Sequence, residues 1–169
     1  MSGLCHTSNL RIGLGEDLHR LTAGGPLRLG GIDIPHNLHA MGHSDADVLL
    51  HAITDALLGA AGLPDIGQLF PNTQEKNRNR DSAEMLQLAY GKVKQAGYRS
   101  INLDCVVAAE SPPLSPHKEA ICSRLAEILS LDVAQVNVKA KTGEGIGPIG
   151  QQQIIQAHCV ALLEKIPES

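Results

Sequence analysis

The segment from Asp45 to Leu63 constrains the fold most strongly, because its apolar residues recur at the spacing of one helix face. This stripe consists of Val48, Leu49, Ala52, Ile53, Ala56 and Leu57. Ser44 is the expected N-cap, with Asp47 three residues later, and Gly62 and Pro64 are expected to end the helix. An amphipathic helix of this length needs a second layer on which to bury its stripe.

The other periodic segments are typical of strands and of two further helices. Helices are expected at 81–95 and 116–131, strands at 10–21, 100–110 and 136–142, and a hairpin at 27–35 around Gly30 and Gly31. The apolar segment 154–163 fits a helix or a strand, but Gln156 and His158 stand two residues apart, which favours a strand. Strands interleaved with three helices predict an α/β (α+β) fold, a two-layer sandwich with a mixed β-sheet and helices on one face.

Length and composition are those of an ordinary single-domain protein. The 169 residues are expected to form one domain, 1–169, with residues 1–10 as a loose N-terminal extension. These first residues lack the pattern of a secretory signal, and no apolar run reaches the roughly 18 residues of a membrane helix. We therefore expect a cytoplasmic protein without a membrane partner.

Charge, aromatic content and cysteine spacing argue against several classes of function. With a formal net charge of −4 and only Phe70, Tyr90 and Tyr98 as aromatic residues, nucleic acid is not an expected partner. The four cysteines are widely spaced and form no Cys-x-x-Cys pair. This spacing argues against a zinc knuckle and against a thioredoxin-like site.

Asp17, His19 and His51 form the strongest candidate for a metal site. Asp17 and His19 lie two residues apart in a predicted strand, so their side chains point to the same face. His51 lies inside an otherwise apolar run of the predicted helix, where an imidazole ring needs a polar partner. One carboxylate and two imidazoles leave a coordination position open, as in a catalytic zinc site. The alternative is chance, because a short Asp-x-His pattern is common.

Asp47 and Asp55 are predicted to support His51. The three residues lie one helical turn apart on the same face. A carboxylate that accepts the second ring N–H of a ligating histidine fixes the tautomer of that ring. The alternative is that both acids belong to a solvated helix face.

Two further segments are candidates for contacts with phosphate. His43 and Ser44 directly precede the predicted helix, whose N-terminal N–H groups and dipole favour an anion, although Ser44 could act only as a cap. The glycine-rich segment 143–150 matches neither a nucleotide P-loop nor a dinucleotide fingerprint. Within it, Glu144 suits a hard cation bound to phosphate oxygens.

Five segments together carry a family resemblance. They are Arg11-Ile-Gly-x-Gly-x-Asp17-x-His19, Leu29-Gly-Gly-Ile-x-Ile-Pro35, His43-Ser44-Asp-Ala-Asp47-Val-x-x-His51-Ala-x-Thr-Asp55, Asp65-Ile-Gly67-x-Leu-Phe70-Pro and Val136-Asn-Val-Lys-Ala140-Lys-Thr142-Gly-Glu144. In this order they resemble the 2-C-methyl-D-erythritol 2,4-cyclodiphosphate synthase family of the non-mevalonate isoprenoid pathway. They extend from about residue 11 to Glu144, so the resemblance covers most of the chain.

The resemblance implies a homotrimer with active sites between adjacent subunits. It implies one Zn²⁺ per subunit on Asp17, His19 and His51, and Mg²⁺ or Mn²⁺ on Glu144 beside the diphosphate. His43 and Ser44 would bind the substrate phosphate. Further substrate contacts are implied for Asp17, Leu18 and His19, for Asp65, Ile66, Gly67 and Phe70 around the methylerythritol part, and for Ala109 to Ser115, Ala140, Lys141, Thr142, Gly143 and Glu144 around the cytidine diphosphate group.

The implied reaction is that of a phosphorus-oxygen lyase. It converts 4-diphosphocytidyl-2-C-methyl-D-erythritol 2-phosphate into the cyclic 2,4-diphosphate and CMP, by attack of the 2-phosphate on the β-phosphorus of the same molecule. Because this nucleophile is already anionic near neutral pH, positioning and charge neutralisation are expected to carry the catalysis. His43 and Thr142 are predicted to orient the reactants and stabilise the transition state.

The chain departs from the family pattern at several positions, namely Glu16, Asn72, Gln74, Pro113, Lys141, Gly143, Pro148 and Gln151 to Gln153. Lys141 could add a positive charge beside the diphosphate. Pro148 and Gln151 replace a phenylalanine and an arginine, and that arginine lies near a cavity on the trimer axis that can hold prenyl diphosphates. Binding of a prenyl diphosphate is therefore not expected here.

Two other functions are compatible with the same residues. A metal-dependent phosphoesterase on this scaffold would use an activated water in place of the internal phosphate. A trimeric binding protein would keep the metal but would not turn over the substrate. Products and metal content distinguish these possibilities.

Overall fold

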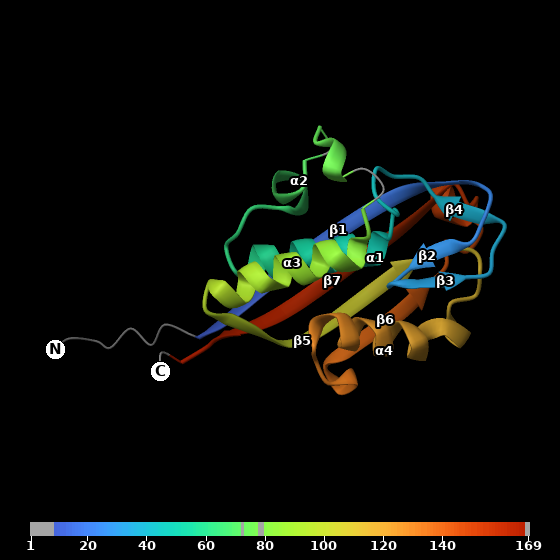
Figure 1. The fold of residues 1–169 in the computed structure, drawn as a ribbon. Coiled ribbons are helices and arrows are strands. Elements are labelled where there is room, and N and C mark those ends of the chain that lie inside the picture. The colour runs from blue at the N-terminus through green and yellow to red at the C-terminus, as the bar shows by residue number, and fades with distance from the viewer. Residues whose placement is uncertain (1–8, 72, 78–79, 168–169) are drawn as a thin grey trace.

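The computed structural model describes residues 9–71, 73–77 and 80–167, and it consists of a sheet with helices on one face (Figure 1). The strands of the sheet, in spatial order, are β4 (Leu38–Ala40), β1 (Leu10–Ala23), β7 (Ile154–Lys165), β5 (Tyr98–Ala108) and β6 (Val136–Lys141). β5 and β6 are parallel, whereas the other neighbouring strands are antiparallel, so the predicted mixed sheet is confirmed.

A loose extension is expected at residues 1–10, of which residues 1–8 lie outside the described part of the chain. Its end was misplaced, because Leu10 already pairs with Glu164 as the first residue of β1. The ambiguous segment after residue 153 is confirmed as a strand, and β7 lies at the centre of the sheet between β1 and β5. Every second residue of β7 from Ile155 to Leu163 is buried, which is the strand period.

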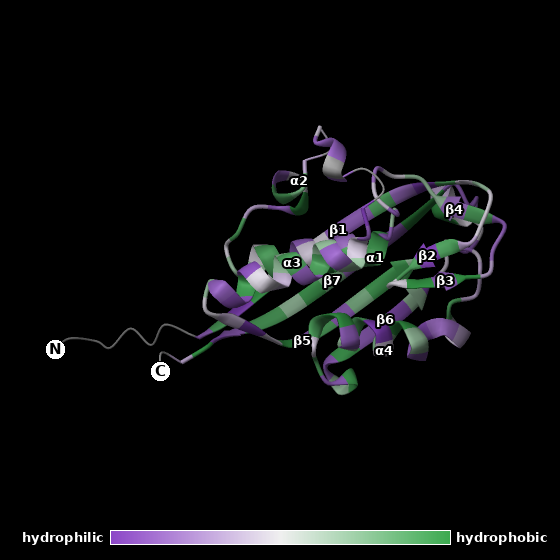
Figure 2. Ribbon diagram, viewed as in Figure 1, coloured by the Kyte–Doolittle hydropathy of each residue, from purple (hydrophilic) through white to green (hydrophobic). Residues whose placement is uncertain are grey.

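The three long helices predicted from the sequence are α1 (Val48–Ala60), α3 (Ser82–Gln95) and α4 (Lys118–Leu129). All three lie on the same face of the sheet (Figure 1). Short helices that the periodicity did not indicate are α2 (Ile66–Leu69) and α5 (Gly147–Gly150), with single 3₁₀ turns at Glu75–Asn77, Ser115–His117 and Val133–Gln135. β7 is largely hydrophobic, whereas α3 and α4 alternate between hydrophobic and hydrophilic residues (Figure 2), as expected for a core between the two layers.

The start of α1 differs from the prediction. Its N-cap is Asp47, whose carboxylate accepts the N–H of Leu50, and Ser44 lies in the preceding loop. The same carboxylate accepts N–H groups from Gly30 at 2.9 Å and Gly31 at 2.7 Å. These glycines form the turn between β2 (Leu27–Leu29) and β3 (Ile32–Ile34), with positive φ angles of 62° and 77°. Asp47 therefore joins the predicted hairpin to the first turn of α1.

Glycines in β1 allow α1 to approach the sheet closely. A Cβ atom at Gly13 would lie 2.0 Å from the carbonyl oxygen of Ala56. A Cβ atom at Gly15 would lie 2.0 Å from the carbonyl oxygen of Ala52 and 2.5 Å from the amide nitrogen of Ala56. Both contacts are to helix backbone, so α1 has to move away from β1 if either glycine gains a side chain.

We expect Gly15→Ala to destabilise the protein by about 1–3 kcal/mol, as overpacking of a core does. The matched control is Gly91→Ala in the middle of α3, where an added Cβ meets nothing within 4 Å. That variant should gain up to about 1 kcal/mol from the higher helix propensity of alanine. Urea unfolding at equal subunit concentration measures both changes. Equal effects of the two substitutions would contradict the close approach of α1 to β1.

The opposite face of the sheet is not covered by α1, α3 or α4 (Figure 1), and it exposes large apolar side chains. Ile12, Leu14 and Leu18 of β1 are 72%, 67% and 54% exposed, and Val160 of β7 is 38% exposed. Among them lie Glu16 and His158, whose side chains are 3.7 Å apart. We call Ile12, Leu14, Leu18 and Val160 the open face. In the residues described here, no helix is long and apolar enough to cross a membrane.

Candidate metal and substrate site

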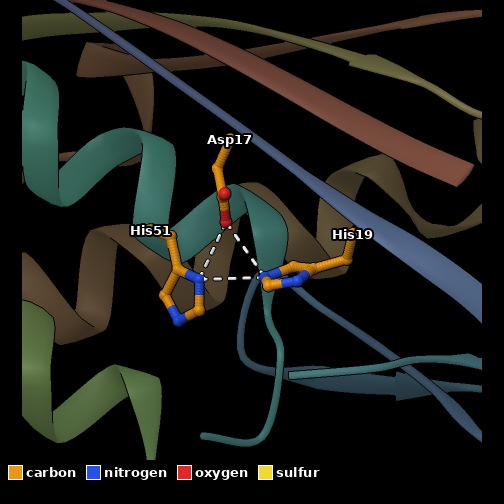
Figure 3. Close-up of side chains that lie close together, drawn as sticks. All are labelled: Asp17, His19 and His51. Carbon is orange, nitrogen blue, oxygen red and sulfur yellow. Dashed lines mark hydrogen bonds and ion pairs between the residues drawn. The ribbon is translucent and has the colours of Figure 1, made fainter. Parts of the chain in front are cut away.

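Asp17, His19 and His51 are brought together by β1 and α1. Asp17 and His19 lie on the same face of β1, and His51 lies in the first turns of α1 (Figure 3). Asp17 Oδ2 is 2.8 Å from His51 Nδ1 and 3.0 Å from His19 Nε2, and the two ring nitrogens are 3.2 Å apart. The structure thus places the three predicted ligands at one point.

The donor set fits a zinc ion. Each residue offers one nitrogen or oxygen atom, and these are atoms that zinc accepts in proteins. With bonds of about 2.0–2.1 Å in a tetrahedron, the edges measure about 3.3 Å. The observed separations of 2.8, 3.0 and 3.2 Å are close to three such edges.

Mutual contacts set the charge of the trio. Burial opposes ionisation of Asp17, but hydrogen bonds and charges of His19 and His51 outweigh it and hold the pKa of this carboxyl well below its usual range. Burial would lower the pKa of His51, but the hydrogen bond and charge of Asp17 outweigh it and raise this pKa. A carboxylate that stays ionised beside two imidazoles is a suitable ligand set for a divalent cation.

The second nitrogen of His51 does not contact the two acids expected to support it. The Asp47 carboxylate is occupied by the N–H groups of the β2–β3 turn and of α1, and Asp55 accepts the N–H of Ile66 at 2.7 Å. That prediction is wrong because both carboxylates bind backbone groups of other segments. Instead, His51 Nε2 lies 2.9 Å from Ser82 Oγ and 3.1 Å from Ser44 Oγ.

The trio lies in a cavity of about 340 Å³. Its lining comprises Asp17, His19, Gly42, His43, Ser44, His51, Ile66, Gly67, Phe70, Asn77 and Met85. Most of the residues predicted for the phosphate and the methylerythritol part therefore line this cavity. Asp65 is the N-cap of α2 and binds the N–H and side chain of Gln68. Leu18 is an exception, because it alternates with Asp17 and His19 and its side chain belongs to the open face.

The segments predicted for the cytidine group lie at the ends of β5 and β6, and they do not line this cavity. β5 and β6 end side by side, and the N–H of Ala109 donates to the carbonyl of Lys141 at 2.9 Å. The N–H of Gly143 donates to Glu110 at 2.9 Å, and Thr142 Oγ1 donates to Glu144 at 3.0 Å. One chain thus carries two separate parts of the predicted site.

Sequence reasoning missed several residues of the site. Gly42, Asn77 and Met85 line the cavity, and Ser82 contacts His51. Met85 and Ser82 belong to α3, which the sequence indicated only as an amphipathic helix. The Asp-Ser pair at the start of that helix resembles an ordinary cap, so no sequence signal distinguished Ser82 from a capping residue.

Comparisons with known proteins identify a family for this chain. A model of the YgbB family matches residues 10–164. A 2-C-methyl-D-erythritol 2,4-cyclodiphosphate synthase of Rhodopirellula baltica is 49% identical over 92% of this chain and 93% of its own length. The enzyme of the same name from Shouchella clausii is 51% identical over 92% of this chain and 98% of its own length.

A solved structure gives the same result for the fold. IspF of Plasmodium falciparum in a CDP complex superposes with a TM-score of 0.83 at 34% identity, covering 95% of this chain and all of that one. The family match spans β1 to β7 and includes the three clustered ligands. The chain therefore belongs to the YgbB family, together with 2-C-methyl-D-erythritol 2,4-cyclodiphosphate synthases to which it is about half identical.

Proposed function

We propose that this chain is a metal-dependent lyase that cyclises 4-diphosphocytidyl-2-C-methyl-D-erythritol 2-phosphate in isoprenoid biosynthesis and releases CMP. The observation that carries the proposal is the convergence of Asp17, His19 and His51 beside His43 and Ser44 in one cavity of a YgbB-family chain. A location in the cytoplasm is part of the same proposal.

The proposed reaction exchanges one phosphorus-oxygen bond for another. An oxygen of the 2-phosphate forms a bond to the β-phosphorus, while the bond from that phosphorus to the oxygen shared with the α-phosphorus breaks. CMP leaves with the shared oxygen and its electron pair. No water is consumed, so the second product is the cyclic 2,4-diphosphate.

The residues of the cavity have separate roles in this proposal. Asp17, His19 and His51 hold zinc, which when bound neutralises phosphate charge. His43 and Ser44 donate to the 2-phosphate and keep it close to the β-phosphorus. Ile66, Gly67 and Phe70, which line the same cavity, enclose the methylerythritol part.

The nucleotide part is assigned to the segments at the ends of β5 and β6. Thr142 is proposed to orient the diphosphate, and Glu144 to hold Mg²⁺ or Mn²⁺ on it. Ala109, Ser115, Ala140, Lys141 and Gly143 complete this pocket. Since these segments do not line the cavity of their own chain, a neighbouring copy is proposed to supply them.

The open face supports a trimer as the functional assembly. Isolated apolar side chains on a protein surface are ordinary, but neighbouring residues of β1 and β7 here expose four of them on one uncovered sheet face. Packing of this face against copies of itself would remove them from water. The same packing would bring the zinc residues of one subunit toward the nucleotide segments of the next.

We expect Leu14→Asp to convert the assembly to monomers and to abolish CMP release, because the substitution places a charge in the centre of the proposed interface. The control is Leu88→Asp in α3, a position that is 46% exposed and lies on the helical side of the molecule. Light scattering during gel filtration measures both masses. An unchanged trimer with Leu14→Asp would contradict the use of the open face.

Product analysis tests the proposed reaction. Incubation of the purified protein with the cytidine substrate, zinc and magnesium should give CMP and a cyclic diphosphate, identified by phosphorus NMR. A linear product with inorganic phosphate would instead identify a phosphoesterase. About one zinc per chain without CMP release under any metal would identify a binding protein.

A further inference from the structure

Two serine hydroxyl groups contact the side of the His51 ring that faces away from Asp17. His51 Nε2 is 2.9 Å from Ser82 Oγ and 3.1 Å from Ser44 Oγ. Ser82 is the first residue of α3 and only 1% exposed, whereas Ser44 lies in the loop before α1. The tautomer of the His51 ring depends on whether these hydroxyl groups accept a hydrogen bond from Nε2 or donate one to it.

Asp45 fixes the direction of the Ser82 hydrogen bond. Ser82 Oγ donates to Asp45 Oδ1, and the N–H of Ser82 donates to Asp45 Oδ2 at 3.2 Å. Arg28 Nε lies 3.8 Å from the same carboxylate, so a positive charge faces it. A carboxylate only accepts hydrogen bonds, and a serine hydroxyl has one hydrogen to give. Ser82 Oγ can therefore only accept from His51.

We propose that Ser82 and Asp45 are positioning residues that hold His51 in the tautomer with hydrogen on Nε2. In a neutral imidazole of this tautomer, the free lone pair is on Nδ1. Nδ1 is the atom that faces Asp17 and His19 (Figure 3). The chain of contacts from Asp45 through Ser82 thus presents the lone pair of His51 to the metal. The binding of a metal at this site, and its identity as zinc, rest on the proposed function.

Ser44 offers the opposite arrangement. Its Oγ accepts the N–H of Ala46 at 3.2 Å, a contact that does not fix the direction of its own hydrogen. If Ser44 donated a hydrogen bond to Nε2, the ring hydrogen would be on Nδ1. Nδ1 would then have no free lone pair for a cation. The two serines therefore lead to opposite predictions for the same ring.

Zinc affinity of the full-length protein, measured without substrate by competition with a chelator, distinguishes them. We expect Ser82→Ala to weaken zinc binding about 10- to 100-fold, the usual loss for a partner of a ligating histidine, and Ser44→Ala to weaken it by less than about threefold. Circular dichroism verifies that both variants are folded. A larger loss with Ser44→Ala, or equal affinity of Ser82→Ala and wild type, would overturn the proposal.

The ring itself gives a second readout. In nitrogen-15 NMR of the zinc-loaded protein, His51 should show hydrogen on Nε2 and none on Nδ1. Asp45→Asn is the second variant, and it decides the question if Ser82→Ala does not fold. Its amide can donate to Ser82 Oγ and free the serine hydrogen for Nε2, so weaker zinc binding is expected. Zinc affinity of Asp45→Asn equal to that of wild type would also overturn the proposal.

These outcomes are separable from those of the proposed function, because neither measurement uses substrate. A protein that binds zinc with hydrogen on Nε2 but releases no CMP would contradict the proposed reaction alone. A protein that releases CMP, yet binds zinc equally well as wild type and as Ser82→Ala, would contradict the role of Ser82 alone.

Discussion

Replacement of His51 by alanine should abolish zinc binding and reduce CMP release on the order of 10³-fold or more, because it removes one of the three proposed protein ligands. His51 Nδ1 lies 2.8 Å from Asp17 Oδ2 and 3.2 Å from His19 Nε2, so the substitution takes away one corner of the three-atom cluster. Metal analysis of the purified variant and the initial rate of CMP release at saturating magnesium measure the two effects.

The control for this variant is His39→Ala. His39 lies on β4 and contacts the carbonyl of Gly24 at 3.0 Å, outside the cavity that holds the trio. Its replacement should leave metal content and rate close to those of wild type. Undiminished turnover of His51→Ala would exclude the proposed ligand role, whatever the behaviour of the control.

Replacement of Asp47 by alanine should destabilise the protein by about 3–5 kcal/mol, since three buried backbone N–H groups would lose their acceptor. These donors belong to Gly30, Gly31 and Leu50, and Asp47 itself is fully buried. The loss should appear as a lower midpoint of urea unfolding. Subunit concentration has to be equal in all samples, because assembly contributes to the measured stability.

Asp81→Ala provides the matched comparison. Asp81 is also an N-cap, but it is exposed and its carboxylate accepts the single N–H of Ala83. Water can replace this acceptor, so the expected cost is about 1 kcal/mol, as for an ordinary cap. Similar losses of unfolding free energy for both variants would show that the link between the β2–β3 turn and α1 contributes little to stability.

Much of the fold could be predicted because periodicity is a local property. The stripe from Val48 to Leu57 indicated α1, and the two-residue spacing of Gln156 and His158 correctly favoured a strand for β7. The start of α1 was misplaced, although Ser44 has the right side chain for a cap. Asp47 is the N-cap, and its carboxylate also accepts N–H groups from a turn 16 and 17 residues earlier in the chain.

In the candidate site, too, some features could be predicted from the sequence and others could not. Asp17, His19 and His51 could be named from residue type and spacing, since a strand and an adjacent helix suffice to gather them. The contacts that support His51 could not be predicted in this way. His51 and Ser82 are 31 residues apart in the chain, and they come into contact because α1 packs near α3. Asp55 was assigned to His51 by helical spacing, but it binds the N–H of Ile66 instead.

The sequence by itself determined which long helices and strands form and which side chains can bind a metal, because both follow from chain-local periodicity and from the chemistry of each residue. Only the tertiary structure decided which hydrogen-bond partner each buried polar group has, which nitrogen of His51 faces Asp17, and that Leu18 belongs to the open face. These properties depend on distances between elements far apart in the chain, and a hydrogen bond forms only within a few tenths of an ångström of about 2.9 Å.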